Sequence, residues 1–304
     1  MKLDNNKSSF NQKLDIIDAI NSLQLKNVSI EEIMELLRWL SGGHRTTAMI
    51  GGTIVFYRGI KYDLKPKLYQ DLIYPPIEFT KVSRANIQGE QMFYASTKKK
   101  AVFYELGAQQ AENFVIGTWI SSPRLLLNNV GYTSENLREL GAKDLTPLFN
   151  NSGIKNDEQD LISNFLARTF SQQITDENYY KLTNAIARNS ICQIGKGSDF
   201  FKEFEGLLYP TIKYKANADN VVLKKDAVDS QKITLERAEY IEIVNYVDGK
   251  YQYRIKDVCD TLNGDKLIWK CLKNTWSVND ETEDIYFIGD TAFNENGDQI
   301  EPDK

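Results

Sequence analysis

The spacing of apolar residues changes along this chain of 304 residues, and that change constrains the fold more than any other feature. Near the start, apolar residues recur every three or four positions, which is the period of a helix: Leu14, Ile17, Ile20 and Leu23. From Ile50 the pattern is strand-like, over about 133–204 it is helical, and from Gly206 to Cys271 it is strand-like again. Helices and strands in separate blocks predict an α+β fold, a mixed β core with helical additions at the N-terminus and in the middle.

The same pattern divides the chain into three parts. Residues 1–45 are predicted to form an N-terminal helical segment. Residues 46–278 are predicted to form the main domain, with a helical insertion at about 133–204. Residues 279–304 have a low apolar density and many carboxylates, which predicts a partly ordered acidic tail.

Short local signals place individual elements. Ser29 and Glu32 stand at the spacing of a capping box at a helix N-terminus, and Asp248-Gly249 is typical of a hairpin turn. The run 53–57 predicts a strand that ends at Arg58-Gly59. Residues 98–106 predict a helix capped by Ser96 or Thr97.

The formal charge of -5 is unevenly distributed. The last 25 residues hold nine acidic side chains and one lysine, so the rest of the chain carries a net charge of about +3. The acidic total argues against direct nucleic-acid binding. A mildly basic body suits an anionic small molecule, and solvated surface lysines would give the same charge.

Histidine and cysteine usage narrows the chemistry. His44 is the single histidine, so histidine-based triads and sites with several histidine ligands are excluded, and no metal is predicted. The three cysteines lack paired spacing, which indicates a reducing compartment. The first ten residues are polar, and no run of about 18 apolar residues occurs, so we expect a cytoplasmic protein without a membrane span.

Residues suited to a dinucleotide gather between positions 57 and 105, although the glycine-rich phosphate motifs of the common nucleotide folds are missing. The guanidinium group of arginine has paired N–H donors that fit phosphate oxygens, and tyrosine rings offer flat faces for a base or nicotinamide. A carboxylate near the sugar can stabilise an oxocarbenium-like ribose. The candidates are Tyr57, Arg58, Arg84, Tyr94, Tyr104 and Glu105. A structural arginine–glutamate ion pair is the alternative.

Five runs in this region, taken in order, resemble a known family. They are Phe56-Tyr57-Arg58-Gly59, Tyr74-Pro75-Pro76, Ser83 to Gly89, Met92 to Ser96, and Ala101 to Leu106. Together they resemble the RES family, the toxins of RES/Xre toxin–antitoxin systems. The resemblance implies an ADP-ribosyltransferase-like fold, degradation of NAD as the substrate, and an Xre-type antitoxin as a partner.

The resemblance also implies roles for single residues. Arg58 and Arg84 match the family's arginines and would grip the pyrophosphate. Tyr94 matches its tyrosine and would pack against nicotinamide or ribose, with Tyr57 as a further nucleotide contact. Glu105 matches its glutamate and would stabilise the ribosyl cation. Thr211 stands where the family has a serine, keeps the hydroxyl and adds a methyl, and would orient phosphate or substrate.

Three functions are compatible with these residues. The first is cleavage of the nicotinamide glycosidic bond of NAD by hydrolysis or phosphorolysis, which would deplete cellular NAD. The second is ADP-ribosyl transfer to a protein or another acceptor from the same site. The third is a RES-like module that binds a partner without turnover.

Overall fold

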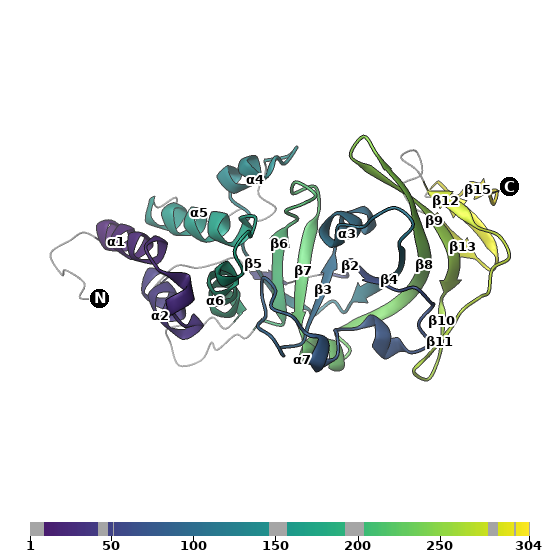
Figure 1. Ribbon diagram of the computed structural model, residues 1–304, viewed down its shortest axis with the longest axis horizontal. Helices are drawn as coiled ribbons and strands as arrows, with labels where there is room; N and C mark the ends of the chain where they lie inside the picture. Colours follow the sequence, from purple (N-terminus) through teal and green to yellow (C-terminus); the bar gives the residue numbers. More distant parts are fainter. Residues whose placement is uncertain are drawn as a thin grey trace.

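The fold is α+β, as the apolar spacing predicts. The computed structural model describes residues 9–41, 48–50, 52–145, 157–191, 204–278, 285–294 and 296–303. Helices gather at one end, a large sheet occupies the middle, and a small sheet lies at the C-terminal end (Figure 1). None of the helices in the described part of the chain combines the length and apolar character needed to cross a membrane.

The central sheet has ten strands, in the order β1-β5-β6-β7-β3-β2-β4-β8-β9-β12. Each neighbouring pair is antiparallel except β5 and β6, which are parallel. In sheet order the strands are β1 (Ala48–Ile50), β5 (Leu126–Asn129), β6 (Gly206–Pro210), β7 (Asp219–Lys224), β3 (Met92–Ser96), β2 (Val55–Lys61), β4 (Asn113–Ser121), β8 (Ile233–Val247), β9 (Lys250–Cys259) and β12 (Trp276–Val278).

The sheet forks between β2 and β3. On the side away from β3, β2 pairs with β4 over all seven residues of β2. On the side away from β2, β3 pairs with β7 over all five residues of β3. Between β2 and β3, however, the only paired residues are Tyr57 and Ser96. The two strands diverge beyond this pair, so main-chain groups in the fork must find partners other than a neighbouring strand.

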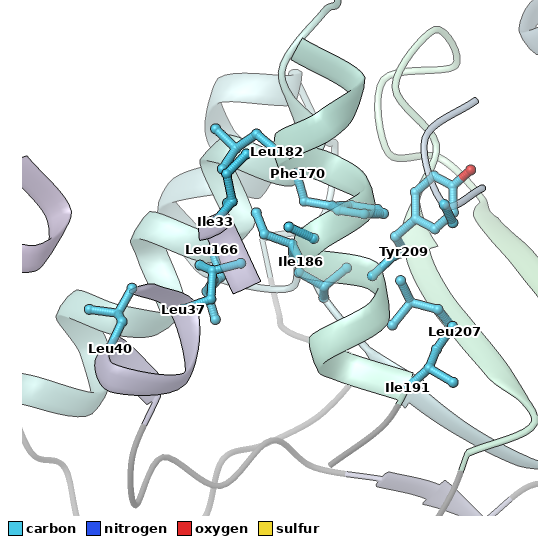
Figure 2. Packing of buried hydrophobic residues seen from close by; sticks show 14 of the residues in the cluster. Ile33, Leu37, Leu40, Leu166, Phe170, Leu182, Ile186, Ile191, Leu207 and Tyr209 are labelled. Atoms are coloured by element: carbon cyan, nitrogen blue, oxygen red, sulfur yellow. The ribbon is translucent and has the colours of Figure 1, made fainter. Parts of the chain in front are cut away.

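A layer of four helices packs against the β6 side of the sheet (Figure 1). These helices are α1 (Ser9–Asn21), α2 (Ile30–Ser41), α5 (Asp157–Ser171) and α6 (Tyr180–Ile191). Figure 2 shows apolar side chains of α2, α5 and α6 converging with Leu207 and Tyr209 of β6, and Ile16, Ile17 and Ile20 of α1 belong to the same cluster. The capping box is confirmed, because the Ser29 amide donates to Glu32 Oε2 at 2.8 Å and the Glu32 amide donates to Ser29 Oγ at 3.2 Å.

Helix α3 (Lys99–Leu106) covers β2 and the fork. It begins one residue later than predicted, and neither predicted cap acts as one: Lys98 stands at the N-cap, while Thr97 Oγ1 accepts from the Asp219 amide at 3.0 Å. Gly59 permits the close approach of α3, since a Cβ there would lie 2.4 Å from Val102 Cγ1. Strand β2 continues through Arg58-Gly59 to Lys61, although the sequence predicts that it ends at Arg58-Gly59.

Shorter elements complete the chain. The further α-helices are α4 (Ser134–Leu140) and α7 (Lys225–Asp229), and the 3-10 turns are η1 (Leu25–Asn27), η2 (Tyr69–Leu72), η3 (Ile77–Phe79) and η4 (Glu177–Tyr179). Strands β10 (Thr261–Asn263) and β11 (Lys266–Ile268) form a small hairpin. At the predicted hairpin turn, Asp248 and Gly249 have φ angles of 52° and 77° and connect β8 to β9.

The acidic C-terminal region contains more structure than its composition suggests. Strands β13 (Ile285–Ile288), β14 (Thr291–Asn294) and β15 (Gln299–Ile300) form a three-stranded antiparallel sheet. Ile285 and Ala292 are buried in the same apolar cluster as Trp276 of β12. A few well-placed apolar residues thus attach this segment to the main sheet although its overall apolar density is low.

Candidate functional site

A cavity of about 330 Å³ lies at the fork, between α3, the turn at residues 83–89 and the start of α6. Five of the seven residues named from the sequence line it: Tyr57, Arg58, Arg84, Tyr94 and Glu105. Tyr104 and Thr211 do not. Its remaining lining residues are Gly59, Ser83, Ala95, Ser96, Val102, Leu106, Tyr180, Tyr209, Lys213 and Asn220. The charged members are three cations and one carboxylate, which favours an anionic ligand.

Arg58 occupies the fork itself. Its Nη1 donates to the carbonyl of Tyr94 at 2.8 Å and its Nε to the carbonyl of Ile73 at 2.9 Å, and its guanidinium lies 5.2 Å from the centre of the Phe93 ring. Burial lowers the pKa of Arg58 to about 10, which keeps the charge at neutral pH. Among the described residues, no carboxylate forms an ion pair with it. A partly buried cation of this kind is a candidate anion site.

Arg84 is positioned by the helical layer. Its guanidinium donates to the carbonyl of Phe170, to the carbonyl of Gln172 at 3.1 Å, and lies 5.8 Å from the centre of the Phe170 ring. These carbonyls belong to the C-terminal end of α5, where cations are favoured. The Phe170 ring in turn meets Tyr209 edge-on at 5.2 Å (Figure 2). The end of α5 therefore fixes Arg84 at the rim of the cavity.

Tyr94 connects the two arginines. Its carbonyl accepts from Arg58, while its hydroxyl accepts from the Ala85 amide at 3.0 Å and donates to Asn86 Oδ1 at 2.8 Å, in the turn that carries Arg84. Burial raises the pKa of Tyr94 to about 12, so the hydroxyl stays protonated at neutral pH. With both ends held, the part of Tyr94 that faces the cavity presents a fixed surface.

Glu105 is oriented by the loop that follows β6. Its Oε1 accepts from the Ile212 amide at 3.1 Å and from the Lys213 amide at 3.3 Å, and Lys213 Nζ donates to the Glu105 carbonyl at 2.9 Å. Within the described part of the chain, Oε2 has no hydrogen-bond donor and no arginine pairs with this carboxylate. Glu105 is thus held at one oxygen while the other is left available to a ligand, and the alternative of an arginine–glutamate ion pair does not describe its geometry.

Thr211 lies outside the lining of the cavity. Its side chain is fully buried, and its Oγ1 donates to the carbonyl of Ala218 at 3.0 Å. The Thr211 amide donates to the same carbonyl at 2.9 Å, and the Thr211 carbonyl accepts from the Ala216 amide at 2.7 Å. Thr211 therefore closes the loop 211–218, whose amides at Ile212 and Lys213 hold Glu105.

Tyr57 contributes to the floor of the cavity and to a buried charge network. Lys99 Nζ lies 5.8 Å from the centre of the Tyr57 ring and 2.9 Å from Glu239 Oε2. Glu239 also faces Arg237 Nη2 at 2.8 Å. All charges of this triad are largely withdrawn from water, so the pairing of Lys99 in the first turn of α3 fixes that helix on the sheet.

The structure adds residues that the motifs did not indicate as site residues. Tyr209 and Asn220 stand opposite each other on β6 and β7, and Asn220 is also the partner of Ser96 on β3. Both side chains are buried, and burial raises the pKa of the Tyr209 hydroxyl. Because strands alternate their faces, these residues share the face of Tyr94. Their alignment depends on strand register, which no local motif specifies.

In the described ranges, no group of three or more histidine, cysteine, aspartate or glutamate side chains is placed to hold a metal ion. His44 and Cys192 lie outside the described residues, and Cys259 and Cys271 are free thiols.

Comparisons of the chain with protein-family models, with curated proteins and with solved structures give no match.

Proposed function

We propose that the cavity at the fork binds NAD and cleaves its nicotinamide glycosidic bond. The observation that carries the proposal is the convergence of four features on one cavity: a partly buried arginine, a second arginine, fixed tyrosines and a carboxylate. Among the residues that the structure describes, no carboxylate pairs with Arg58 and no donor reaches Glu105 Oε2. Arginines suit the pyrophosphate, ring faces suit nicotinamide or ribose, and a carboxylate suits a developing ribosyl cation.

In the reaction the bond between C1′ of the ribose and the nicotinamide nitrogen breaks, and its electron pair leaves with nicotinamide. Glu105 Oε2 stabilises the positive charge that develops on the ribose. Water or inorganic phosphate then adds to C1′; water loses a proton to solvent to give ADP-ribose. Arg58 and Arg84 hold the pyrophosphate, and Tyr57 and Tyr94 orient the nicotinamide ribose.

For Thr211 we propose a positioning role in place of direct contact with phosphate or substrate. Its buried hydroxyl is engaged with Ala218, and the loop that it closes supplies the two amides that hold Glu105. Threonine suits this role as serine does, because either hydroxyl can donate to the carbonyl.

The direct test is incubation of the purified protein with NAD, followed by quantification of nicotinamide, ADP-ribose, phosphorylated ADP-ribose and modified protein. Nicotinamide with ADP-ribose identifies hydrolysis, and nicotinamide with phosphorylated ADP-ribose identifies phosphorolysis. Modified protein in equal amount to nicotinamide supports ADP-ribosyl transfer instead. Absence of nicotinamide release at micromolar protein would exclude cleavage and transfer together.

A module that binds a partner without turnover is the second candidate. The hydrogen bonds of Arg58 and Arg84 favour this candidate, because both guanidinium groups already donate to main-chain carbonyls, as they would in a purely structural role. Glu105 Oε2, which no donor in the described ranges reaches, and the surplus of cations favour the enzyme. Under either function, the family resemblance leads us to propose an Xre-type antitoxin as partner, a cytoplasmic location where NAD is accessible, and no direct contact with nucleic acid.

A further inference from the structure

A second cavity, of about 530 Å³, adjoins the site at the C-terminal end of α3. We call it the tyrosine cavity, because its walls combine three tyrosines with three amide side chains: Tyr104, Tyr246, Tyr251, Gln109, Gln110 and Asn245. Lys213 lines both cavities. The two cavities therefore meet at the Lys213 side chain.

The tyrosine rings form a pre-organised aromatic surface. Tyr246 and Tyr251 have ring centres 4.5 Å apart, and Tyr104 meets Tyr251 edge-on at 4.9 Å. The hydroxyls of Tyr104 and Tyr251 donate to the carbonyls of Gly249 and Ala108, which fixes both rings. Packing of the β8–β9 hairpin explains the buried Tyr251. It does not explain Tyr246, which remains 50% exposed beside three amides.

The positive charge of Lys213, where the two cavities meet, determines which aromatic ligands fit the tyrosine cavity. Tyrosine cages commonly bind cations, but Lys213 places a positive charge at the entrance, its Nζ bonded to the Glu105 carbonyl at the end of α3. A planar ring attached to an anionic group fits this arrangement better. The face of a ligand ring can stack on the tyrosines, and its polar edge can form hydrogen bonds with the amide side chains. The lysine can pair with a phosphate of the ligand.

We propose that the tyrosine cavity binds the adenine ring of the dinucleotide, with Lys213 beneath the adenylate phosphate. The proposal rests on the function proposed for the first cavity. That cavity, at about 330 Å³, is at the small end of the range for ligand sites, so a whole dinucleotide needs additional surface. The tyrosine cavity supplies that surface with the chemistry of a base-binding site.

The test compares NAD with nicotinamide mononucleotide, which carries the same scissile bond and lacks the adenosine half. Tyr246→Ala is expected to raise the KM for NAD about tenfold, since a stacking partner of the base is lost, and to leave kcat unchanged. The KM for nicotinamide mononucleotide is expected to stay the same. Tyr246→Phe, which keeps the ring, is the matched control and should behave as the parent. Equal effects of Tyr246→Ala on both substrates, or no effect on either, would overturn the proposal.

Binding of AMP, measured by calorimetry on the full chain, separates this proposal from the proposed function. AMP should bind the parent and Tyr246→Phe and lose about tenfold in affinity with Tyr246→Ala. If this holds while no nicotinamide is released from NAD, the adenine subsite stands and the proposed cleavage fails. If NAD is cleaved while AMP binds Tyr246→Ala as it binds the parent, the subsite fails alone. Displacement of AMP by choline would show a cation cage and overturn the proposal.

Discussion

Different elements hold Glu105 and the two arginines at the cavity, so each residue has a separate predicted effect of mutation. Glu105 is held by two amides of the loop 211–218, whereas Arg58 and Arg84 are held by carbonyls of the fork and of α5. None of the three depends on a described ion pair with another. Their functions can therefore be probed one at a time.

Glu105→Gln should separate chemistry from binding. The amide oxygen can still accept from Ile212 and Lys213, but the negative charge at the developing ribosyl cation is lost. We expect kcat for nicotinamide release to fall by about 10²- to 10³-fold, with NAD affinity and melting temperature nearly unchanged. Glu242→Gln, a partly exposed carboxylate on β8, serves as control and should retain full activity. Parent-like turnover of Glu105→Gln would show that another group stabilises the cation.

Arg84→Ala should weaken binding more than chemistry. It removes a pyrophosphate donor and also the cation at the end of α5. We expect NAD affinity, measured by calorimetry, to fall at least about tenfold and the free energy of unfolding to fall by about 1 kcal/mol. Arg168→Ala, at an exposed arginine of the same helix, is the control and should change neither. Unchanged affinity in Arg84→Ala would remove this arginine from the site.

At the scale of elements, the contact between β2 and α3 determines where Glu105 lies. Gly59 lies against Val102 and Leu106, in the middle and at the C-terminal end of the helix, and Lys99 in its first turn pairs with Glu239. The helix is thus fixed to the sheet at both ends. A shift of α3 would move Glu105 relative to the arginines, because those are held by other elements.

Gly59→Ala tests this coupling. Its Cβ would lie 2.4 Å from Val102 Cγ1 and 3.0 Å from Leu106 Cδ1, so α3 must move. We expect a loss of about 1–3 kcal/mol in the free energy of unfolding, measured with denaturant, and a fall in nicotinamide release. The double variant Gly59→Ala with Val102→Ala removes the nearest clash and should recover part of both. Full activity of Gly59→Ala would show that the position of α3 is not critical.

At the scale of the whole molecule, the helical layer contributes to the site as well as to stability. Ile33, Leu37 and Leu40 of α2 are fully buried against α5 and α6 (Figure 2). The same cluster contains Phe170 and Tyr209, which contact Arg84 and the cavity. The N-terminal helices are therefore part of the framework that holds one arginine in place.

Leu37→Ala should reveal that dependence. We expect a loss of about 2–5 kcal/mol in the free energy of unfolding, as for other large-to-small changes in a core. NAD affinity at a temperature where the variant remains folded should fall as the end of α5 loosens. Trp39→Ala, at a position 55% exposed on the same helix, is the control. A destabilised Leu37→Ala variant with unchanged NAD affinity would limit the layer to a structural role.

Local sequence determined what depends on a few neighbouring residues. The capping box of Ser29 and Glu32 and the Asp248-Gly249 turn follow from hydrogen bonds and dihedral preferences within one or two turns. The segregation of apolar spacing likewise determined the α+β class. The motifs also grouped five residues that line one cavity.

Only the tertiary structure decided how those residues are used. Arg58 lies within a strand at a fork, Arg84 is anchored on α5 86 residues away, and Thr211 is buried where it closes the loop that holds Glu105. Tyr209 and Asn220 join the site through strand register. The physical reason is that fork, register and loop closure depend on packing between distant segments, and local sequence does not encode which distant carbonyl or amide a side chain will meet.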